Sequence, residues 1–245
     1  MGIRLMVVLL TLVGGSGLAS AGDAPTHDPL WEKALAVVAK NREWKPRRVL
    51  EDERLTHPKG GMFDRRTESV HEVYLDDEGR WRARLNSATR GGSDATEARR
   101  KELLKRPKRE FFKPENDVFS PEWNASNTAP RTELQHEFEG RGAVGFQYTM
   151  EAREATWVGV VFVDAVSGVP RLITVVPDRF PVNENVTIRN MTMEFHFKEE
   201  APRWFLERLE IRSNIEAKLS ALFTWKGRSE VTLRFEDWYE VKIED

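Results

Sequence analysis

The chain has 245 residues, with 38 Lys and Arg against 40 Asp and Glu, five His and no Cys. A formal net charge of −2 gives no reason to expect overall attraction to nucleic acid. The absence of Cys excludes disulfides, Cys-ligated zinc, iron–sulfur clusters and thiol nucleophiles. The length suits one domain that can bury a core of its own.

The N-terminus has the three-part pattern of a secretory signal peptide at 1–21. One basic residue, Arg4, precedes the apolar run 5–13, and small residues lead to Ala19–Ala21, which fits an A-x-A cleavage site. The apolar run is shorter than the roughly 20 residues that a membrane-spanning helix needs. A buried N-terminal helix is the alternative interpretation. We expect cleavage, a mature chain of 22–245 without a lipid-bearing Cys, and a soluble protein that works outside the cytoplasm.

Two short helices are predicted. The Asp-Pro pair at 28–29 is a favourable helix start, and apolar residues repeat at helical spacing over 28–40. A second helix is predicted over 94–106, where Asp94 is followed three residues later by Glu97, in the outline of a capping box.

The first predicted strands differ in character. Residues 44–57 contain Pro46 and many charges, which indicates an edge or ragged strand. Residues 68–75 and 80–89 predict a hairpin. The segment 91–131, which holds the second helix and then becomes rich in Pro, Asn and Ser, is interpreted as an insertion between strands.

In the C-terminal half, apolar and polar residues alternate along one short segment after another. The predicted strands cover 144–150, 157–163, 170–176, 190–197, 209–211, 219–225 and 231–235. Such alternation indicates strands with one dry and one wet face. The predicted fold is mainly β (α+β), a curved antiparallel sheet covered by short helices.

The sequence lacks three motifs that are typical of enzyme active sites. There is no G-x-S-x-G elbow, no phosphate-binding G-x-x-x-x-G-K-[ST] loop and no H-E-x-x-H pair. Glu194 and His196 lie two apart on one predicted strand face, where they can share a metal ion or a proton. Polar pairs at this spacing are common on solvated sheet faces, so we expect no metal, no cofactor and no catalysis. A third ligand converging on the pair in a cleft would favour an enzyme.

A basic run at 99–113 holds eight Lys and Arg against two Glu. A solvated helix face is the simplest interpretation. Peripheral contact with an anionic membrane surface, or docking of an acidic partner, are the alternatives. The candidate docking residues are Arg99, Arg100, Lys101, Lys105, Arg106, Lys108 and Arg109.

The chain is well supplied with large apolar side chains, having eight Trp, 13 Phe and six Met. Most of the aromatic residues occupy alternating strand positions, as in the core of any β protein. A curved sheet that does not close needs a cover, and a sheet lined with these residues beneath helices would also suit acyl chains. The candidate lining residues are Phe146, Tyr148, Met193, Phe195, Phe223 and Trp225.

The stretch Val161–Leu172 has a strand ending in Asp, a Ser-Gly turn, then Pro and a new strand, and Phe235–Tyr239 closes the last predicted strand. With the N-terminal helix and midway helices, this layout resembles the outer-membrane lipoprotein-sorting family of the LolA and RseB half-barrel type. The resemblance implies a single domain, 22–245, that forms an incomplete (half) β-barrel. The segment 91–131 departs from the family, because it is longer and more charged than the family's usual midsection.

The same resemblance implies a periplasmic carrier or sensor whose partners are lipid or lipoprotein acyl chains. The alternative is a non-enzymatic envelope scaffold or regulatory protein of the same fold that acts through a protein partner.

Overall fold

The computed structural model describes residues 28–40, 44–58, 60, 64–75, 81–104, 128–138, 140–152, 155–177, 186–200, 203–218 and 224–240. The predicted signal peptide, Phe223, Lys105, Arg106, Lys108 and Arg109 lie outside the described residues, as does the side chain of Tyr148. Among the described helices, none is long and apolar enough to cross a membrane.

The described residues form two helices and eleven strands. The helices are α1 (Pro29–Lys40) and α2 (Thr96–Leu104). The strands are β1 (Trp44–Thr56), β2 (Arg65–Leu75), β3 (Trp81–Arg90), β4 (Ser93–Asp94), β5 (Thr128–Phe138), β6 (Arg141–Ala152), β7 (Ala155–Asp164), β8 (Pro170–Pro177), β9 (Val186–Glu200), β10 (Arg203–Lys218) and β11 (Thr224–Glu240).

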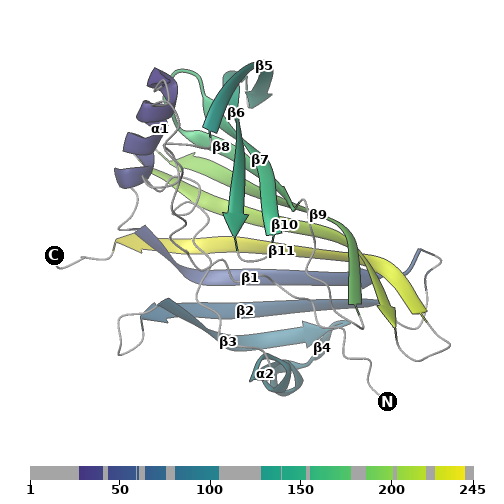
Figure 1. Ribbon diagram of the computed structural model, residues 1–245. Coiled ribbons are helices and arrows are strands. Elements are labelled where there is room, and N and C mark those ends of the chain that lie inside the picture. Colours follow the sequence, from purple (N-terminus) through teal and green to yellow (C-terminus); the bar gives the residue numbers. More distant parts are fainter. Residues whose placement is uncertain are drawn as a thin grey trace.

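All the strands belong to one antiparallel sheet in the order β4-β3-β2-β1-β11-β10-β9-β8-β7-β6-β5. Strands β4 and β5 are its edges, so the described sheet is open rather than closed into a barrel. Figure 1 shows how strongly it twists and curves, since β5 and β6 run across the direction of β1, β2 and β11. The predicted fold class, a curved antiparallel sheet with two short helices, is confirmed.

Strand β1 corrects one prediction. It is not an edge strand, because it pairs with β2 on one side and with β11 on the other. Pro46 is tolerated because the β2 ladder begins only at Arg48, so near Pro46 the strand has one hydrogen-bonded neighbour, Trp238 on β11. The described part of the two predicted strands at 219–225 and 231–235 belongs to a single strand, β11.

The segment 91–131 contains β4, α2 and the first residues of β5. Because β4 and β5 are the two opposite edges of the sheet, this part of the chain links one edge to the other. The segment therefore separates a β1–β4 group from a β5–β11 group along the chain.

Helix α1 packs on one face of the sheet, called here the inner face. Asp28 caps the helix, since its carboxylate accepts a hydrogen bond of 2.8 Å from the Leu30 backbone N–H. On the buried side of α1, the Trp31 ring lies 4.9 Å from the ring of Phe146. The Trp204 indole N–H donates to the Val37 carbonyl at 3.2 Å. Apolar packing and one long-range hydrogen bond thus attach α1 to β6 and β10.

The β7–β8 turn, the stretch on which the family resemblance rests, is held by its own Asp. Asp164 accepts hydrogen bonds from the backbone N–H groups of Val166 and Ser167, at 3.0 and 2.7 Å, and pairs with Arg171 at 3.1 Å. Burial raises its pKa, but these hydrogen bonds outweigh burial and bring the pKa down to about 2. The turn then closes through Gly168, whose φ of 76° suits a residue without Cβ.

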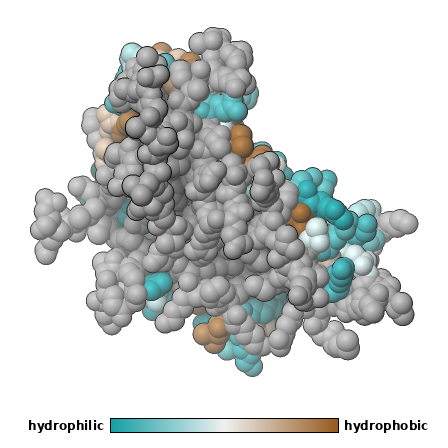
Figure 2. All heavy atoms as spheres, in the orientation of Figure 1, coloured by the Kyte–Doolittle hydropathy of each residue, from teal (hydrophilic) through white to brown (hydrophobic). Residues whose placement is uncertain are grey.

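The described surface is mainly hydrophilic on the face drawn in Figure 2, where its hydrophobic atoms form small, separate patches. The large apolar side chains that are exposed among the described residues are Tyr74, Leu104, Val166 and Val176. They come from different elements, so they do not predict a docking surface.

Candidate functional site

The register of the ladders shows how the inner face changes across the sheet. One row of directly paired residues, from β3 to β6, is Ala88, Ser69, Glu51, Leu233, Leu209, Phe195, Ile173, Val161 and Phe146. The next row is Arg90, Thr67, Glu53, Val231, Ile211, Met193 and Val175. Both rows are polar on β2 and β1 and become apolar at β11. The inner face is therefore amphipathic along the direction that crosses the strands.

The apolar part of the inner face contains three of the six predicted lining residues. Phe146, Met193 and Phe195 are buried in one core cluster, to which α1 contributes Trp31. Next to α1 the inner face is therefore a packed core. Further members that sequence reasoning did not single out are Met191, Trp204, Leu209 and Ile211. The two-residue alternation that marks the predicted lining also marks Met191, Leu209 and Ile211. It does not mark Trp204, which lies beyond the irregularity in β10 between Leu206 and Arg208.

Trp225 is buried but lies apart from that cluster, at the start of β11. A Cβ added to Gly227 would lie 2.1 Å from the Trp225 ring and 2.6 Å from the Thr56 carbonyl oxygen. The indole therefore lies directly over Gly227, and the missing side chain makes room for it. Among the described residues the Trp225 indole N–H has no hydrogen-bond partner.

The polar part of the inner face is occupied by an ion-pair cluster beneath α2. Its members, called here the α2 cluster, are Glu51, Glu53, Arg65, His71, Arg90, Arg99 and Glu102. Arg99 is fully buried, and its guanidinium lies 3.1 Å from a Glu51 carboxylate oxygen and 2.8 Å from a Glu53 oxygen. Since α2 buries Arg99 and exposes Leu104, charge rather than apolar packing attaches this helix to the sheet.

Burial of Arg99 corrects the predicted docking site. Its side chain is 0% exposed, so it belongs to the interior and not to a surface that a membrane or acidic partner touches. Arg100 and Lys101 are exposed on α2, and Arg100 forms an ion pair with Glu97 on the same helix. The sequence does not distinguish the buried Arg99 from the exposed Arg100 and Lys101, because adjacent basic residues of one run point to different sides of a helix.

The electrostatics of the α2 cluster favour fully charged groups. Burial raises the pKa of Glu51, but the hydrogen bond with His71 and the positive charge of Arg99 outweigh burial and lower it to about 2. Burial lowers the pKa of Arg99, and the charges of Glu51 and Glu53 more than reverse that effect. Glu51 and Arg99 therefore keep their charges at neutral pH.

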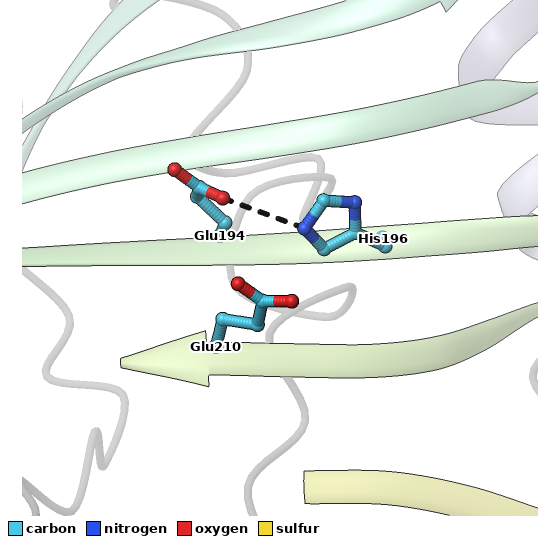
Figure 3. Close-up of side chains that lie close together, drawn as sticks. All are labelled: Glu194, His196 and Glu210. Atoms are coloured by element: carbon cyan, nitrogen blue, oxygen red, sulfur yellow. Dashed lines mark ion pairs between the residues drawn. The ribbon is translucent and has the colours of Figure 1, made fainter. Parts of the chain in front are cut away.

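A second group of polar residues lies on the outer face, because these residues alternate with the buried Met193 and Phe195. Figure 3 shows the three side chains close together. Glu194 and His196 come from β9, and Glu210 on β10 lies directly opposite Glu194 in the ladder. One ligand atom from each of the three residues lies within 4.8 Å of the others. The structure thus supplies the third ligand that the sequence could not identify.

Two arginines on β10 already neutralise these carboxylates. Arg212 pairs with Glu210 and lies 3.3 Å from Glu194, and the Arg208 side chain lies 2.9 Å from Glu210. Burial and the charge of Arg208 lower the pKa of His196. Two carboxylates facing two guanidiniums have no excess negative charge for a cation, so the arrangement is an ion-pair network. A metal ion would have to displace Arg212 from it.

Comparison with known proteins gives structural similarity alone. No protein-family profile and no curated protein sequence matches the chain. The fold is similar to a LolA superfamily protein from Nitrosomonas europaea, at 10% identity and a TM-score of 0.35, over 88% of this chain and 93% of that chain. It is also similar to a DUF1329 family protein from Desulfovibrio piger, at 6% identity and a TM-score of 0.38, over 88% and 94%. The first bears the superfamily name to which the sequence resemblance points.

Proposed function

We propose that this chain is an exported periplasmic protein that binds the acyl chains of a lipid or lipoprotein against the apolar inner face of its sheet, as a carrier or sensor. The observation that supports this most is the uninterrupted apolar row from Leu233 on β11 to Phe146 on β6. It crosses six strands, or about 24 Å at the usual strand spacing.

Such a face binds acyl chains because binding removes apolar surface from water. The gain in binding free energy is about 0.8 kcal/mol for each buried methylene. Helix α1 covers part of this face, so binding there requires α1 to move or the acyl chain to lie beside it. Met side chains on β9 suit a guest of irregular shape because they repack easily.

The test is saturation binding of fluorescent fatty acids of increasing chain length to the mature protein, residues 22–245. Affinity rises with each added methylene if the apolar face holds the chain. Met193→Trp fills volume on the inner face and weakens binding, whereas Thr192→Trp, on the same strand but the outer face, leaves it unchanged. Circular dichroism confirms that both variants are folded. Absence of saturable binding, or an affinity independent of chain length, would contradict the proposal.

A second candidate is a non-enzymatic envelope scaffold or regulatory protein that acts through a protein partner. The packed contact between Trp31 and Phe146 favours it, because a face filled by the protein's own side chains needs no lipid. Photo-crosslinking from Arg100 and Lys101 positions in intact envelopes separates the two candidates. A trapped protein and no lipid binding by the purified chain would support the scaffold.

A further inference from the structure

Strand β3 carries an open ladder on the side that faces away from β2, at the lower edge of the sheet in Figure 1. Its neighbour on that side, β4, pairs only with Thr89 and Arg90. Among the residues that the structure describes, no strand pairs with the earlier part of β3, which begins at Trp81. An open ladder of this kind is able to take a further strand, because its outward N–H and C=O groups have no partner in the sheet.

Two hydrogen bonds at Ala88 show which backbone groups of β3 point outward. The Ala88 N–H donates to the Thr96 hydroxyl at 3.0 Å, and the Ala88 carbonyl accepts a bond of 2.8 Å from the Ala95 N–H. Both groups therefore point away from β2, as those of alternate residues do in an antiparallel ladder. The start of α2 satisfies them, so the ladder is closed at this point. The register shift in the β2–β3 ladder adds one residue, after which the outward positions are Leu85, Ala83 and Trp81.

The side chains along this edge differ between the two faces of the sheet. Leu85 is buried on the inner face, and Ala83 shares that face but is exposed. Arg82 and Arg84 alternate with them and lie on the outer face. The Arg84 guanidinium pairs with Glu72 at 2.6 Å, but its side chain is 65% exposed and has further donors for a second carboxylate. An added strand therefore meets apolar side chains on the inner face and two cations on the outer face.

The two arginines discriminate between candidate strands. If a second copy of the chain added its own β3 with the two Ala83 residues paired, Arg82 of each copy would lie directly opposite the partner's Arg84. Like charges directly opposite one another destabilise a pair of strands, whereas acidic side chains at the same positions stabilise it. The charge of this edge therefore disfavours a second copy and favours an acidic strand.

We propose that the edge Trp81–Leu85 is a docking site for a protein partner, which adds an extended segment whose apolar and acidic residues alternate. Its apolar residues share the inner face with Ala83 and exchange backbone hydrogen bonds with β3. Its acidic residues pair with Arg82 and Arg84 on the outer face. The edge is as long as an ordinary strand. This inference goes beyond acyl-chain binding, because it needs no ligand on the inner face, and it gives the scaffold candidate a partner of defined chemistry.

The test is the fluorescence anisotropy of a fluorescein-labelled Val-Glu-Val-Glu-Val peptide titrated with the mature protein. We expect saturable binding, which a Val-Lys-Val-Lys-Val peptide does not show. N-methylation of the Val residues removes the N–H donors that face β3, so it abolishes binding. N-methylation of the Glu residues, whose N–H groups face away from β3, leaves the affinity unchanged.

Two variants test the same edge from the side of the protein. Ala83→Pro removes one outward N–H, a change that an edge strand tolerates, and weakens binding about two- to tenfold, the loss of one hydrogen bond. Arg82→Glu places a like charge opposite the peptide and weakens binding about threefold or more. Arg100→Glu on α2 changes the net charge equally and is the matched control, with unchanged affinity. Circular dichroism shows that each variant is folded.

Absence of saturable binding of the Val-Glu-Val-Glu-Val peptide would overturn this inference. Equal affinities of the Glu and Lys peptides, or of the Arg82→Glu and Arg100→Glu variants, would overturn it as well, because the charge of the edge would then select nothing. Equal effects of the two N-methylation patterns would show that the peptide does not join the sheet. The fatty-acid titrations are measured separately, so failure at this edge is distinguishable from failure of the proposed function.

Discussion

Replacing Arg99 by Met removes the cation that neutralises two buried carboxylates, Glu51 and Glu53. The pKa of Glu51 is lowered from 4.5 to about 2, so its ionised form is favoured in the folded state by about 3 kcal/mol. Leaving a buried ion pair without one partner costs about 3–5 kcal/mol. We therefore expect Arg99→Met to reduce the free energy of unfolding by about that amount at pH 7.

This loss depends on pH in a defined direction. The pKa of Glu51 is lower in the folded protein, so its stabilisation is present above the unfolded value of 4.5 and is lost as the pH falls towards 2. In Arg99→Met the burial of Glu51 is no longer offset by that cation. The difference in the free energy of unfolding between wild type and variant should therefore narrow as the pH falls from 7 to 3. Only the part of the effect that is due to Arg99 is lost in the variant, because the hydrogen bond between Glu51 and His71 remains.

Urea denaturation followed by Trp fluorescence measures both the loss of stability and its dependence on pH. The slope of the unfolding free energy against urea concentration shows whether unfolding stays two-state. Arg100→Met is the matched control, because Arg100 is the next residue of α2 and its exposed ion pair with Glu97 is worth at most about 1 kcal/mol. Replacing Arg99, Glu51 and Glu53 together by Met should recover most of the stability. Equal losses for the Arg99 and Arg100 variants, or a loss that does not change with pH, would refute this account of how α2 is attached.

Three further predictions concern other parts of the sheet. Gly227→Ala should lower stability by about 1–3 kcal/mol in thermal melts, because its Cβ would meet a Trp ring, whereas Gly142→Ala, with open space around it, should be neutral; equal melts would contradict the packing. The His196 ring should titrate below 6.5 in NMR spectra and higher in Arg208→Gln, and its contribution to stability, present above 6.5, is lost as the pH falls; an unshifted titration would exclude the burial described. Trp31→Ala should cost about 3–5 kcal/mol and increase hydrogen exchange in α1, and unchanged exchange would show that another contact anchors the helix.

The sequence is informative wherever a strand has one dry and one wet face. On β9, Met191, Met193 and Phe195 face the core while Thr192 and Glu194 are only half-buried, as the alternation predicts. Local spacing suffices there because the period of two follows from strand geometry itself. Helix α1 is predicted by its cap and its helical repeat for the same reason, that both signals lie within a few residues. Helix α2 begins at Thr96, two residues after its predicted start, because Asp94 belongs to β4.

The parts that sequence reasoning misread depend on contacts between distant segments. Pro46 and the many charges of 44–57 indicate an edge or ragged strand, but two of these charges, Glu51 and Glu53, are buried on a central strand. Their partner Arg99 lies 48 residues beyond Glu51, within a run that looked uniformly solvated. Glu210 was missed at the outer-face network because only the β9–β10 register, which includes a bulge, brings it opposite Glu194.

The order of the strands also determines when this molecule can fold. Strand β11 is the sole link in the described sheet between β1–β4 and β5–β10, and it is the last of the described strands to be synthesised. Until β11 has arrived, β1 carries an open ladder edge, which is exposed to wrong pairing. Contacts between the first and last strands give the fold a high contact order, so slow assembly is expected. The described sheet therefore stays divided into two separate parts for as long as β11 has not been synthesised.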